Sequence, residues 1–540
     1  MLSCARKGSI AEYVDGPWQF AAQGRLNLNK SAYIPVGENS YTENLWVPGG
    51  TYGLTIAGST GSKLTCGKNA INSITIGTKA VNFASASSDN ATLNTMSTGV
   101  ALGSNAAAGS TTITTATNPG VGYCVIADAQ TALATDSSAY NINGQFTKII
   151  SVTGEGPYML TLDTPLDKTY TTANTSKVYK VPDSYVSRNL TIDGISFVGS
   201  DTYKATAHIQ GMFCDGVTIK NVDFDGIETS AIEFHLSRNI AISGVTAGNA
   251  FDPGTGGKGN IVKLYKCSGV DITDILHNGN GEVRHYVDLP YCSNVLVHDV
   301  ISNGGCNANG GEFSTDHGLA GANIVHQNVK SLGASGVGHP TYLSGSSMPF
   351  SNACMCWFYV RAVGGTTLTD VTGAHLVFNT SKKDTTAYSP GGTTITRGTF
   401  KNIVSGSVST VVLGGDNSAN ERGVGNLTIT DSSFEETKAD TILFDIPRND
   451  FTGKTISIEN TSLKVNGNAY CMIIGGETFQ STTVLLTGVN FTSGQTKVLK
   501  LGNTFAGTIT LSNCYANGVL ITNANKDTYI QNDSGVAISF

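Results

Sequence analysis

The sequence has no apolar run close to the roughly 20 residues that a helix needs to cross a bilayer. Charged residues make up only 14% of the chain, and they give a formal net charge of −7 without any basic stripe. Nucleic-acid binding needs such a stripe, because Lys and Arg side chains neutralise the phosphates. We therefore expect neither membrane insertion nor a nucleic-acid partner.

A helical period of apolar residues is also missing over any useful length. Gly, by contrast, is abundant at 64 residues, and Thr, Ser and Asn are plentiful. Gly and Asn accept the positive φ that sharp corners require. The composition therefore favours an all-β chain of many short strands joined by tight turns.

One phrase recurs through the middle of the chain. Each copy has a small polar turn, then Gly or Asn, and then alternating apolar and polar residues, as in LSRNIAISGVTA at 236–247. The Gly or Asn anchors of the five copies are Gly216, Asn239, Gly269, Asn294 and Asn323. Self-similarity at intervals of a few tens of residues, with strands and no helices, predicts a stacked solenoid of β-coils. Related phrases return as late as 508–518, so we expect the array to run almost to the C-terminus.

The same pattern divides the chain into four predicted regions. No shift in composition marks a linker, and the stretch from about residue 54 to 185 is rich in Thr, Ser, Ala and Gly. The regions are an irregular N-terminal cap (1–45), first coils with a β-rich insertion (46–185), central coils that carry the active site (186–345) and C-terminal coils (346–540).

The 11 cysteines have neither the spacing of a metal site nor that of a disulfide framework. Cys214, Cys267 and Cys292 each lie two residues before an anchor. We predict that they stack in one column as small buried hydrophobic side chains. Reduced thiols fit a protein that folds in a cytosol. No metal or other cofactor is expected.

The histidines and a column of ionisable residues indicate where chemistry takes place. All nine His lie between His208 and His375, which favours a functional role for the middle third over chance. Strand alternation places one outward-pointing polar residue per coil ahead of each anchor. These residues are Gln210, Glu233, Lys263, Asp288 and, in the next coil, His317. Since stacked strands lie about 4.8 Å apart, they would form an exposed ladder. The alternative is a solvated face whose alternating signs only limit charge repulsion.

The coil around 314–318 breaks the repeat, because Asp316 falls where an apolar inward residue belongs. Such violations are where functional sites are expected, and we predict a bulge or a register shift there. The predicted catalytic residues are Glu233, Asp288, Glu312, Asp316 and His317. The predicted substrate-binding residues are Lys263, Glu282, Arg284, His285, Tyr286, His339, Tyr342 and Trp357.

The repeated phrase resembles the right-handed parallel β-helix of the pectate-lyase-like superfamily. Together with VPGGTY at 47–52, it looks like a bacteriophage tailspike over residues 44–540. The resemblance implies a homotrimer that folds in the host cytoplasm, sits on the virion beside a phage tail or baseplate protein, and cleaves a bacterial capsular or O-antigen polysaccharide. Arg284 and His285, followed in the next coil by Asp316 and His317, are similar to a pattern of phage β-helix depolymerases.

Two reactions fit these residues. In a hydrolase, a carboxylic acid protonates the leaving oxygen while a carboxylate activates water or attacks the anomeric carbon. In a lyase, a base removes the proton next to a uronate carboxylate, a cation neutralises that carboxylate, and Tyr or His protonates the leaving oxygen. The candidates for the lyase roles are Lys263, Arg284, His317, His339 and Tyr342. We slightly favour hydrolysis. The motifs of polygalacturonases and the calcium-binding Asp ladder of pectate lyases are both absent, which argues against an ordinary pectinase.

Two other classes remain open. A non-catalytic glycan-binding spike or adhesin would bind sugar on the ladder without any indispensable carboxylate or His. A secreted bacterial polysaccharidase is disfavoured, because no signal-peptide pattern precedes the first coil and the cysteines are expected to be reduced.

Overall fold

The computed structural model consists of two compact units, Met1–Ile324 and Val325–Phe540, which are described separately. The structure describes residues 30–34, 36–41, 45–66, 72–77, 96–128, 144–199, 205–250, 259–279, 283–303, 313–314, 322–331, 340–344, 350–351, 354–361, 366–378, 392–402, 411–413, 426–448, 454–478 and 482–540. None of the helices in these ranges is long and apolar enough to cross a membrane.

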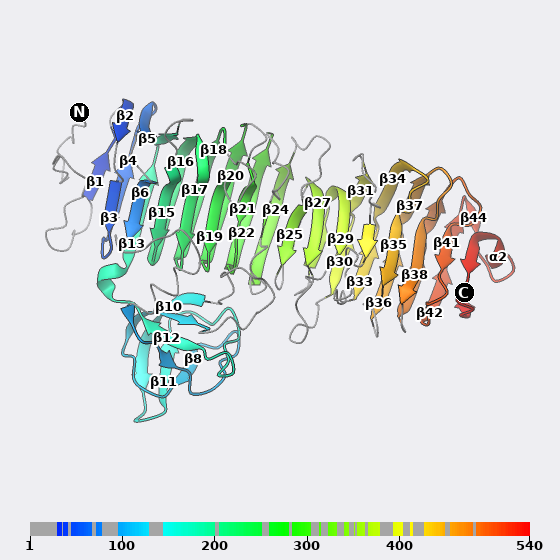
Figure 1. Cartoon of the computed structure of the whole chain (residues 1–540), viewed down its shortest axis with the longest axis horizontal. Coiled ribbons are helices and arrows are strands. Elements are labelled where there is room, and N and C mark those ends of the chain that lie inside the picture. Colours follow the sequence, from blue (N-terminus) through cyan, green and yellow to red (C-terminus); the bar gives the residue numbers. More distant parts are fainter. Residues whose placement is uncertain are drawn as a thin grey trace. The chain divides into compact units, whose positions relative to one another are not determined.

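The first unit is a parallel β-helix whose strands stack in sequence order (Figure 1). One stack contains β1 (Lys30–Tyr33), β4 (Leu54–Ala57), β13 (Ser187–Asp193), β16 (Cys214–Asp225), β18 (Arg238–Ala247), β20 (Ser268–His277) and β22 (Ser293–Ser302). A second contains β2 (Gly37–Tyr41), β5 (Ser62–Cys66), β14 (Ser196–Val198) and the later part of β16. A third contains β3 (Leu45–Pro48), β6 (Asn72–Gly77), β15 (Ala205–Met212), β17 (Ile227–His235), β19 (Asn260–Tyr265), β21 (His285–Asp288) and β23 (Phe313–Ser314). Every pairing in these stacks is parallel, so the predicted parallel β-helix is confirmed.

The core of this unit consists of stacked aliphatic side chains. Ile219, Ile242 and Ile272 are direct register partners on successive coils, and none is more than 1% exposed. Alternation along each strand sends every second side chain inward. A buried aliphatic side chain contributes about 1.5–3 kcal/mol relative to an exposed one. Similar aliphatic side chains on neighbouring strands therefore stack on one another and hold successive coils together.

The predicted Gly and Asn anchors form one column of sharp corners. Gly216, Asn239, Gly269, Asn294 and Asn323 all have a left-handed backbone, with φ between 52° and 85°. The last two of these corners are linked by their amide side chains: Nδ2 of Asn323 donates to Oδ1 of Asn294 at 2.9 Å. Gly has no Cβ to clash in this conformation, and Asn tolerates it better than other side chains do. This explains why each anchor of the repeat is either Gly or Asn.

Replacing Asn239 with Ala is expected to lower the free energy of unfolding by about 1–3 kcal/mol. Its φ of 56° disfavours Ala, and its Nδ2 donates to Oδ1 of Asp215 at 2.7 Å. Asn239→Gly is the matched control, because it loses the same bond but accepts the backbone. Urea unfolding should rank the stabilities as Asn, then Gly, then Ala. An Ala variant as stable as the Gly variant would contradict a backbone constraint at this corner.

The predicted cysteine column is confirmed. Cys214, Cys267 and Cys292 are free thiols with 0% exposure, and each Sγ donates to main-chain carbonyls. Burial raises the pKa of Cys214 to about 12. Such thiols fill space in the core and are not nucleophiles at neutral pH.

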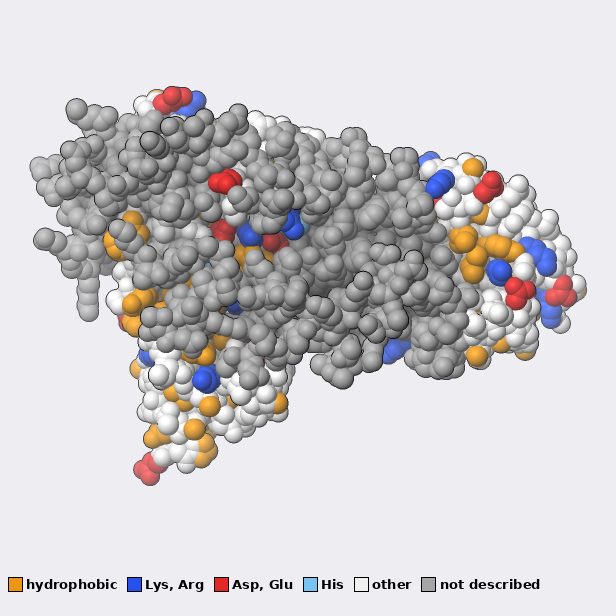
Figure 2. Space-filling view, viewed as in Figure 1, with side chains coloured by type: hydrophobic (Ala, Val, Ile, Leu, Met, Phe, Trp, Pro, Cys, Tyr) orange, Lys and Arg blue, Asp and Glu red, His pale blue; other side chains and the backbone are white. Residues whose placement is uncertain are grey.

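A six-stranded antiparallel sheet lies between β6 and β13 in sequence. Its strand order is β7 (Val100–Ala101), β12 (Lys177–Lys180), β9 (Gly122–Ala127), β10 (Gly144–Thr153), β11 (Tyr158–Leu162) and β8 (Thr112–Thr115). The 3₁₀-helix η1 (Asp183–Tyr185) leads back to the β-helix. Both faces of this inserted sheet bury side chains: Tyr123 and Val125 pack with β-helix residues, and Cys124 and Ile126 pack within the insertion. Its visible outer surface is mainly uncharged, with scattered hydrophobic side chains (Figure 2).

The second unit has the same parallel stacking. One stack contains β26 (Phe350–Ser351), β28 (Thr366–Thr369), β30 (Thr393–Thr396), β33 (Leu427–Thr430), β36 (Thr455–Glu459), β39 (Thr483–Thr487), β42 (Thr508–Ser512) and β46 (Ile538–Ser539). Another contains the start of β29 (Thr372–Phe378), β31 (Thr399–Asn402), β34 (Ser433–Ala439), β37 (Ser462–Asn466), β40 (Asn490–Thr492) and β43 (Tyr515–Ala516). The third contains β25 (Pro340–Ser344), β27 (Cys354–Arg361), the end of β29, β32 (Val411–Leu413), β35 (Phe444–Arg448), β38 (Met472–Thr478), β41 (Leu499–Leu501) and β45 (Ile530–Asn532).

Three further elements lie in the described part of the chain. Strand β24 (Ala322–Ser331) contains the boundary between the units. Near the C-terminus, β44 (Val519–Leu520) forms an antiparallel hairpin with β43, and α2 (Lys526–Tyr529) precedes β45. The predicted region boundaries at 45, 185 and 345 stay predictions.

Candidate functional site

The third stack of the first unit brings the predicted polar column together. Gln210, Glu233, Lys263 and Asp288 are direct register partners on β15, β17, β19 and β21. Neighbouring members are therefore one strand spacing apart, about 4.8 Å. We call these four residues the ladder.

The register places Ser314, and not His317, next to Asp288 in this column. The prediction of His317 comes from counting six residues back from the anchor Asn323, as in the other coils. This count is valid only if the connection between the ladder strand and the anchor has the same length in every coil. In the coil of Asp288, β22 begins at Ser293, whereas Ser314 is followed by β24 only at Ala322. The longer connection moves the column, so that part of the prediction is wrong.

The ladder is buried, and the prediction of an exposed face is also wrong. Gln210, Glu233, Lys263 and Asp288 are 4%, 4%, 9% and 3% exposed. Alternation determines on which side of a sheet a side chain lies, but not what covers that side. Burial also rules out the interpretation of the ladder as a solvated face of alternating charges.

Glu233 is the centre of a hydrogen-bonded network. His235 Nε2 donates to its Oε1 at 2.9 Å, and Ser230 Oγ donates to its Oε2 at 2.8 Å. Burial alone would raise the pKa of Glu233, but the bond from His235 and the charge of Lys263 outweigh it, and the pKa lies below its ordinary value. Glu233 is therefore a carboxylate at neutral pH, suited to act as a base or nucleophile and not as an acid.

Aromatic and cationic groups complete the surroundings of Glu233. Lys263 Nζ lies over the ring of Tyr265 at 5.1 Å from its centroid. The ring of Tyr265 is 4.7 Å from that of His235. Ser230, His235 and Tyr265 were not among the predicted catalytic or substrate-binding residues, although His235 shares the face of Glu233 because it lies two residues further along the strand.

Asp288 is the second carboxylate of the ladder. It lies two strands from Glu233, roughly 9–10 Å away, with Lys263 between them. Its side chain is buried, and its Oδ1 has no hydrogen-bond partner within the described part of the chain. A spacing of about 6.5–9.5 Å is typical of inverting glycosidases, so this pair lies at the wide limit.

His285 and Arg284 also meet the site on β21. Arg284 Nε donates to His285 Nε2 at 3.3 Å. An accepting Nε2 requires a neutral imidazole, because both nitrogens are donors in the protonated ring. His285 is the register partner of Asn260 and lies 5% exposed near Asp288 on the same strand.

Of the other predicted residues, the structure describes the side-chain surroundings of Tyr286 alone. Tyr286 is 1% exposed and packs against His277, with ring centroids 5.5 Å apart. Tyr342 and Trp357 lie on β25 and β27, where the structure describes the backbone alone. Glu282, Glu312, Asp316, His317 and His339 lie outside the described residues, so their roles stay predictions.

The confinement of the histidines has in part a structural cause. His208, His277 and His326 are at most 1% exposed. Burial lowers the pKa of these three rings to about 4, 4 and 3, so they are neutral in the fold. His208, for example, packs near Phe197 and Phe224 at 5.9 and 5.7 Å. Burial gives these three rings a structural role, and the functional interpretation of the histidine distribution stays a prediction. Among the described residues, no group of three or more His, Cys, Asp or Glu side chains could hold a metal ion.

Comparison with known proteins gives similar structures but no similar sequences. No protein-family model and no curated protein matches the chain. The tailspike protein gp49 from Pseudomonas phage LKA1 is 15% identical with a TM-score of 0.43, over 90% of this chain and 74% of that chain. The gp54 tailspike of Acinetobacter baumannii bacteriophage AP22, solved in complex with A. baumannii capsular saccharide, is 11% identical with a TM-score of 0.45, over 93% and 74%. PfbA, a surface adhesin of Streptococcus pneumoniae, is 10% identical with a TM-score of 0.27, over 90% and 84%.

Proposed function

We propose that this chain is a bacteriophage tailspike that binds and hydrolyses a bacterial capsular or O-antigen polysaccharide. The observation that carries the proposal is the ladder, in which two carboxylates flank Lys263 on one sheet of a parallel β-helix. The substrate class, a homotrimeric assembly, a tail or baseplate partner and a place on the virion follow from the sequence resemblance and belong to the same proposal.

In this mechanism Glu233 is the base that activates water. His235, Ser230 and Lys263 keep it ionised, which is the state that a base needs. The general acid would be Asp288 or one of the predicted carboxylic acids Glu312 and Asp316. Because the ladder is buried, a bound glycan would have to displace what covers it. Exclusion of water would then strengthen the electrostatic interactions around the scissile bond.

One observation favours a lyase as the second candidate. Nε2 of His285 accepts a bond from Arg284 and so carries a lone pair. If Arg284 releases this nitrogen when substrate binds, it can remove the proton next to a uronate carboxylate. Lys263 could neutralise that carboxylate. A third possibility is a non-catalytic glycan-binding spike, because both oxygens of Glu233 already have partners.

The test is to incubate the purified chain with a panel of bacterial capsular and O-antigen polysaccharides. We expect new reducing ends without the ultraviolet absorbance of unsaturated uronates, because hydrolysis leaves no double bond. Absorbance that rises in step with reducing ends would establish β-elimination and transfer the central role to His285 and Lys263. A glycan that binds but is not cleaved would support the non-catalytic spike. If no polysaccharide binds, the proposed function is wrong.

A further inference from the structure

A second column of unusual residues runs beside the ladder. Phe213, Leu236, Lys266 and Tyr291 each follow a ladder residue by three positions, and they have φ of 53°, 42°, 53° and 61°. A left-handed backbone costs roughly 1–2 kcal/mol for each residue with a bulky side chain. All four are nevertheless at most 4% exposed. We call them the corner column, and some other contact must offset its strain.

The inserted sheet covers these corners. Phe213 and Leu236 belong to one hydrophobic cluster with Tyr123 and Phe146 of the insertion, and the rings of Phe146 and Phe213 are 5.8 Å apart. At Gly144 the two parts approach so closely that an added Cβ would lie 3.2 Å from Cδ of Lys266 and 3.4 Å from Cδ2 of Leu236. The insertion therefore packs directly on the residues that end the ladder strands.

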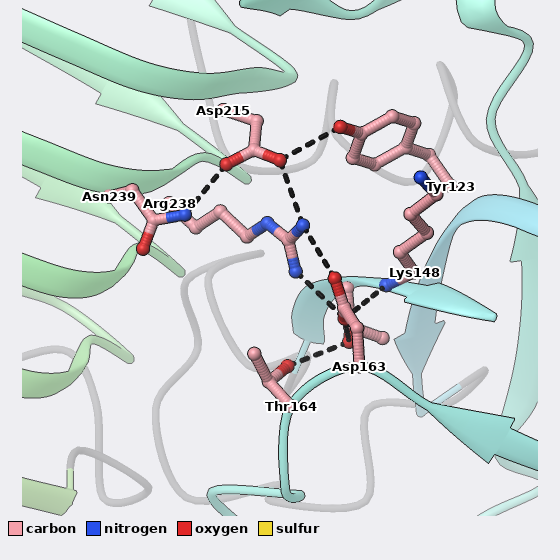
Figure 3. Close-up of polar contacts among 8 residues, drawn as sticks. Tyr123, Lys148, Asp163, Thr164, Asp215, Arg238 and Asn239 are labelled. Carbon is pink, nitrogen blue, oxygen red and sulfur yellow. Dashed lines mark hydrogen bonds and ion pairs between the residues drawn. The ribbon is translucent and has the colours of Figure 1, made fainter. Parts of the chain in front are cut away.

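A buried guanidinium fixes this contact (Figure 3). Arg238 of β18 donates from Nη1 and Nη2 to both oxygens of Asp163 in the insertion, at 2.9 and 2.8 Å. Its Nη2 also donates to Asp215 of β16 at 2.8 Å, and the hydroxyl of Tyr123 donates to the same Asp215 oxygen at 2.8 Å. The side chain of Arg238 is 7% exposed. Charge-assisted, bidentate bonds of this kind are strong and geometrically specific.

A cation of the insertion makes a reciprocal bond. Lys168 Nζ donates to the main-chain oxygen of Tyr291, the last member of the corner column, at 2.6 Å. Its side chain is 6% exposed. The insertion thus holds the β-helix both at Arg238 and at the corner that follows Asp288.

We propose that the inserted sheet is a positioning domain for the candidate site. By covering the corner column and binding Arg238 and Tyr291, it fixes the ends of the strands that carry Glu233, Lys263 and Asp288. The catalytic consequence rests on the proposed function, because a misplacement of about 1 Å can cost on the order of 100-fold in rate. The docking of the insertion does not rest on it.

The experiment compares Arg238→Met and the milder Tyr123→Phe with wild type. The first removes the bonds to Asp163 and Asp215, and the second removes one hydroxyl while keeping the ring. Arg397→Met is the matched control, because Arg397 makes a comparable two-point contact with Asp370 (2.6 and 2.8 Å) on the surface of the second unit. Amide hydrogen exchange is read by mass spectrometry on peptides that cover 210–213, 233–236, 263–266 and 288–291. On the polysaccharide that wild type cleaves, kcat and KM are measured.

For Arg238→Met we expect exchange at least about tenfold faster in these peptides, with peptides of the second unit unchanged. We expect kcat to fall by about tenfold or more with little change in KM, since geometry and not uniform binding is disturbed. Tyr123→Phe should also speed exchange and lower kcat, each by a smaller factor. If Arg238→Met does not fold, the result for Tyr123→Phe tests the proposal. Arg397→Met should change neither.

Unchanged exchange at the corners would overturn the docking role, and faster exchange with unchanged kcat would overturn the positioning role. Failure of the proposed function looks different, because wild type itself would then cleave nothing. In that case exchange of the ladder peptides alone decides whether the insertion holds the strands.

Discussion

Replacing Glu233 with Gln is expected to lower kcat for polysaccharide cleavage by about 10²–10⁴-fold, the usual range for loss of a general base. The amide has the same shape as the carboxylate but cannot take a proton. In wild type the carboxylate is kept ionised by the bond from His235 and the charge of Lys263, against the cost of burial. Binding of the glycan should persist, so KM or the dissociation constant should change far less than kcat.

The control for this experiment is Asp271→Asn, which makes the same chemical change on β20, where the Asp271 side chain is 56% exposed. It should leave kcat unchanged. A folded Glu233→Gln protein with wild-type kcat would remove Glu233 from the mechanism. The pH profile supplies an independent test: if Glu233 is the base, the acid limb of kcat/KM should lie below pH 4.5, its ordinary pKa, because its pKa is lowered.

The fold could be predicted because the residues that recur in the repeat are those that the backbone corners and the buried strand positions require. The left-handed anchors of the repeat are Gly or Asn, and the inward positions of its strands are apolar. Both requirements recur at the strand spacing, so counting along the sequence identified the partners Gln210, Glu233, Lys263 and Asp288 correctly. Counting failed at His317, because connection length is not part of the repeat.

The site could be predicted only in part, because the sequence does not show what lies over a sheet. The same residues that read as an exposed ladder are buried. The corner column was missed for a related reason: Phe213 and Leu236 are poor residues for a left-handed backbone, and only packing against the insertion explains them. At these residues the contacts with the insertion override the backbone preference of the side chain, and a periodic sequence pattern does not show such contacts.

Lowering the pH from 7 to 5 is expected to destabilise the first unit strongly, through His208 and His277. Burial lowers the pKa of each ring to about 4, whereas an unfolded His has its ordinary value of 6.5. Above pH 6.5 both states are neutral and the fold has its full stability. As the pH falls from 6.5 toward 4, the unfolded state binds protons that the folded state does not. Each His should therefore cost about 2 kcal/mol at pH 5, and the two together about 4 kcal/mol.

The measurement is urea-induced unfolding of the whole chain at pH 7 and pH 5, followed by circular dichroism. His208→Gln cannot titrate, so its loss of stability between the two pH values should be smaller than that of wild type by about 2 kcal/mol, even if it is less stable at both. Phe197→Leu is the control: it disturbs the packing against the same ring, whose centroid lies 5.9 Å from that of Phe197, but removes no titrating group. Its loss between pH 7 and 5 should equal that of wild type. If His208→Gln shows the wild-type loss as well, His208 is not held neutral in the fold, and its place among the nine histidines would again call for a functional explanation.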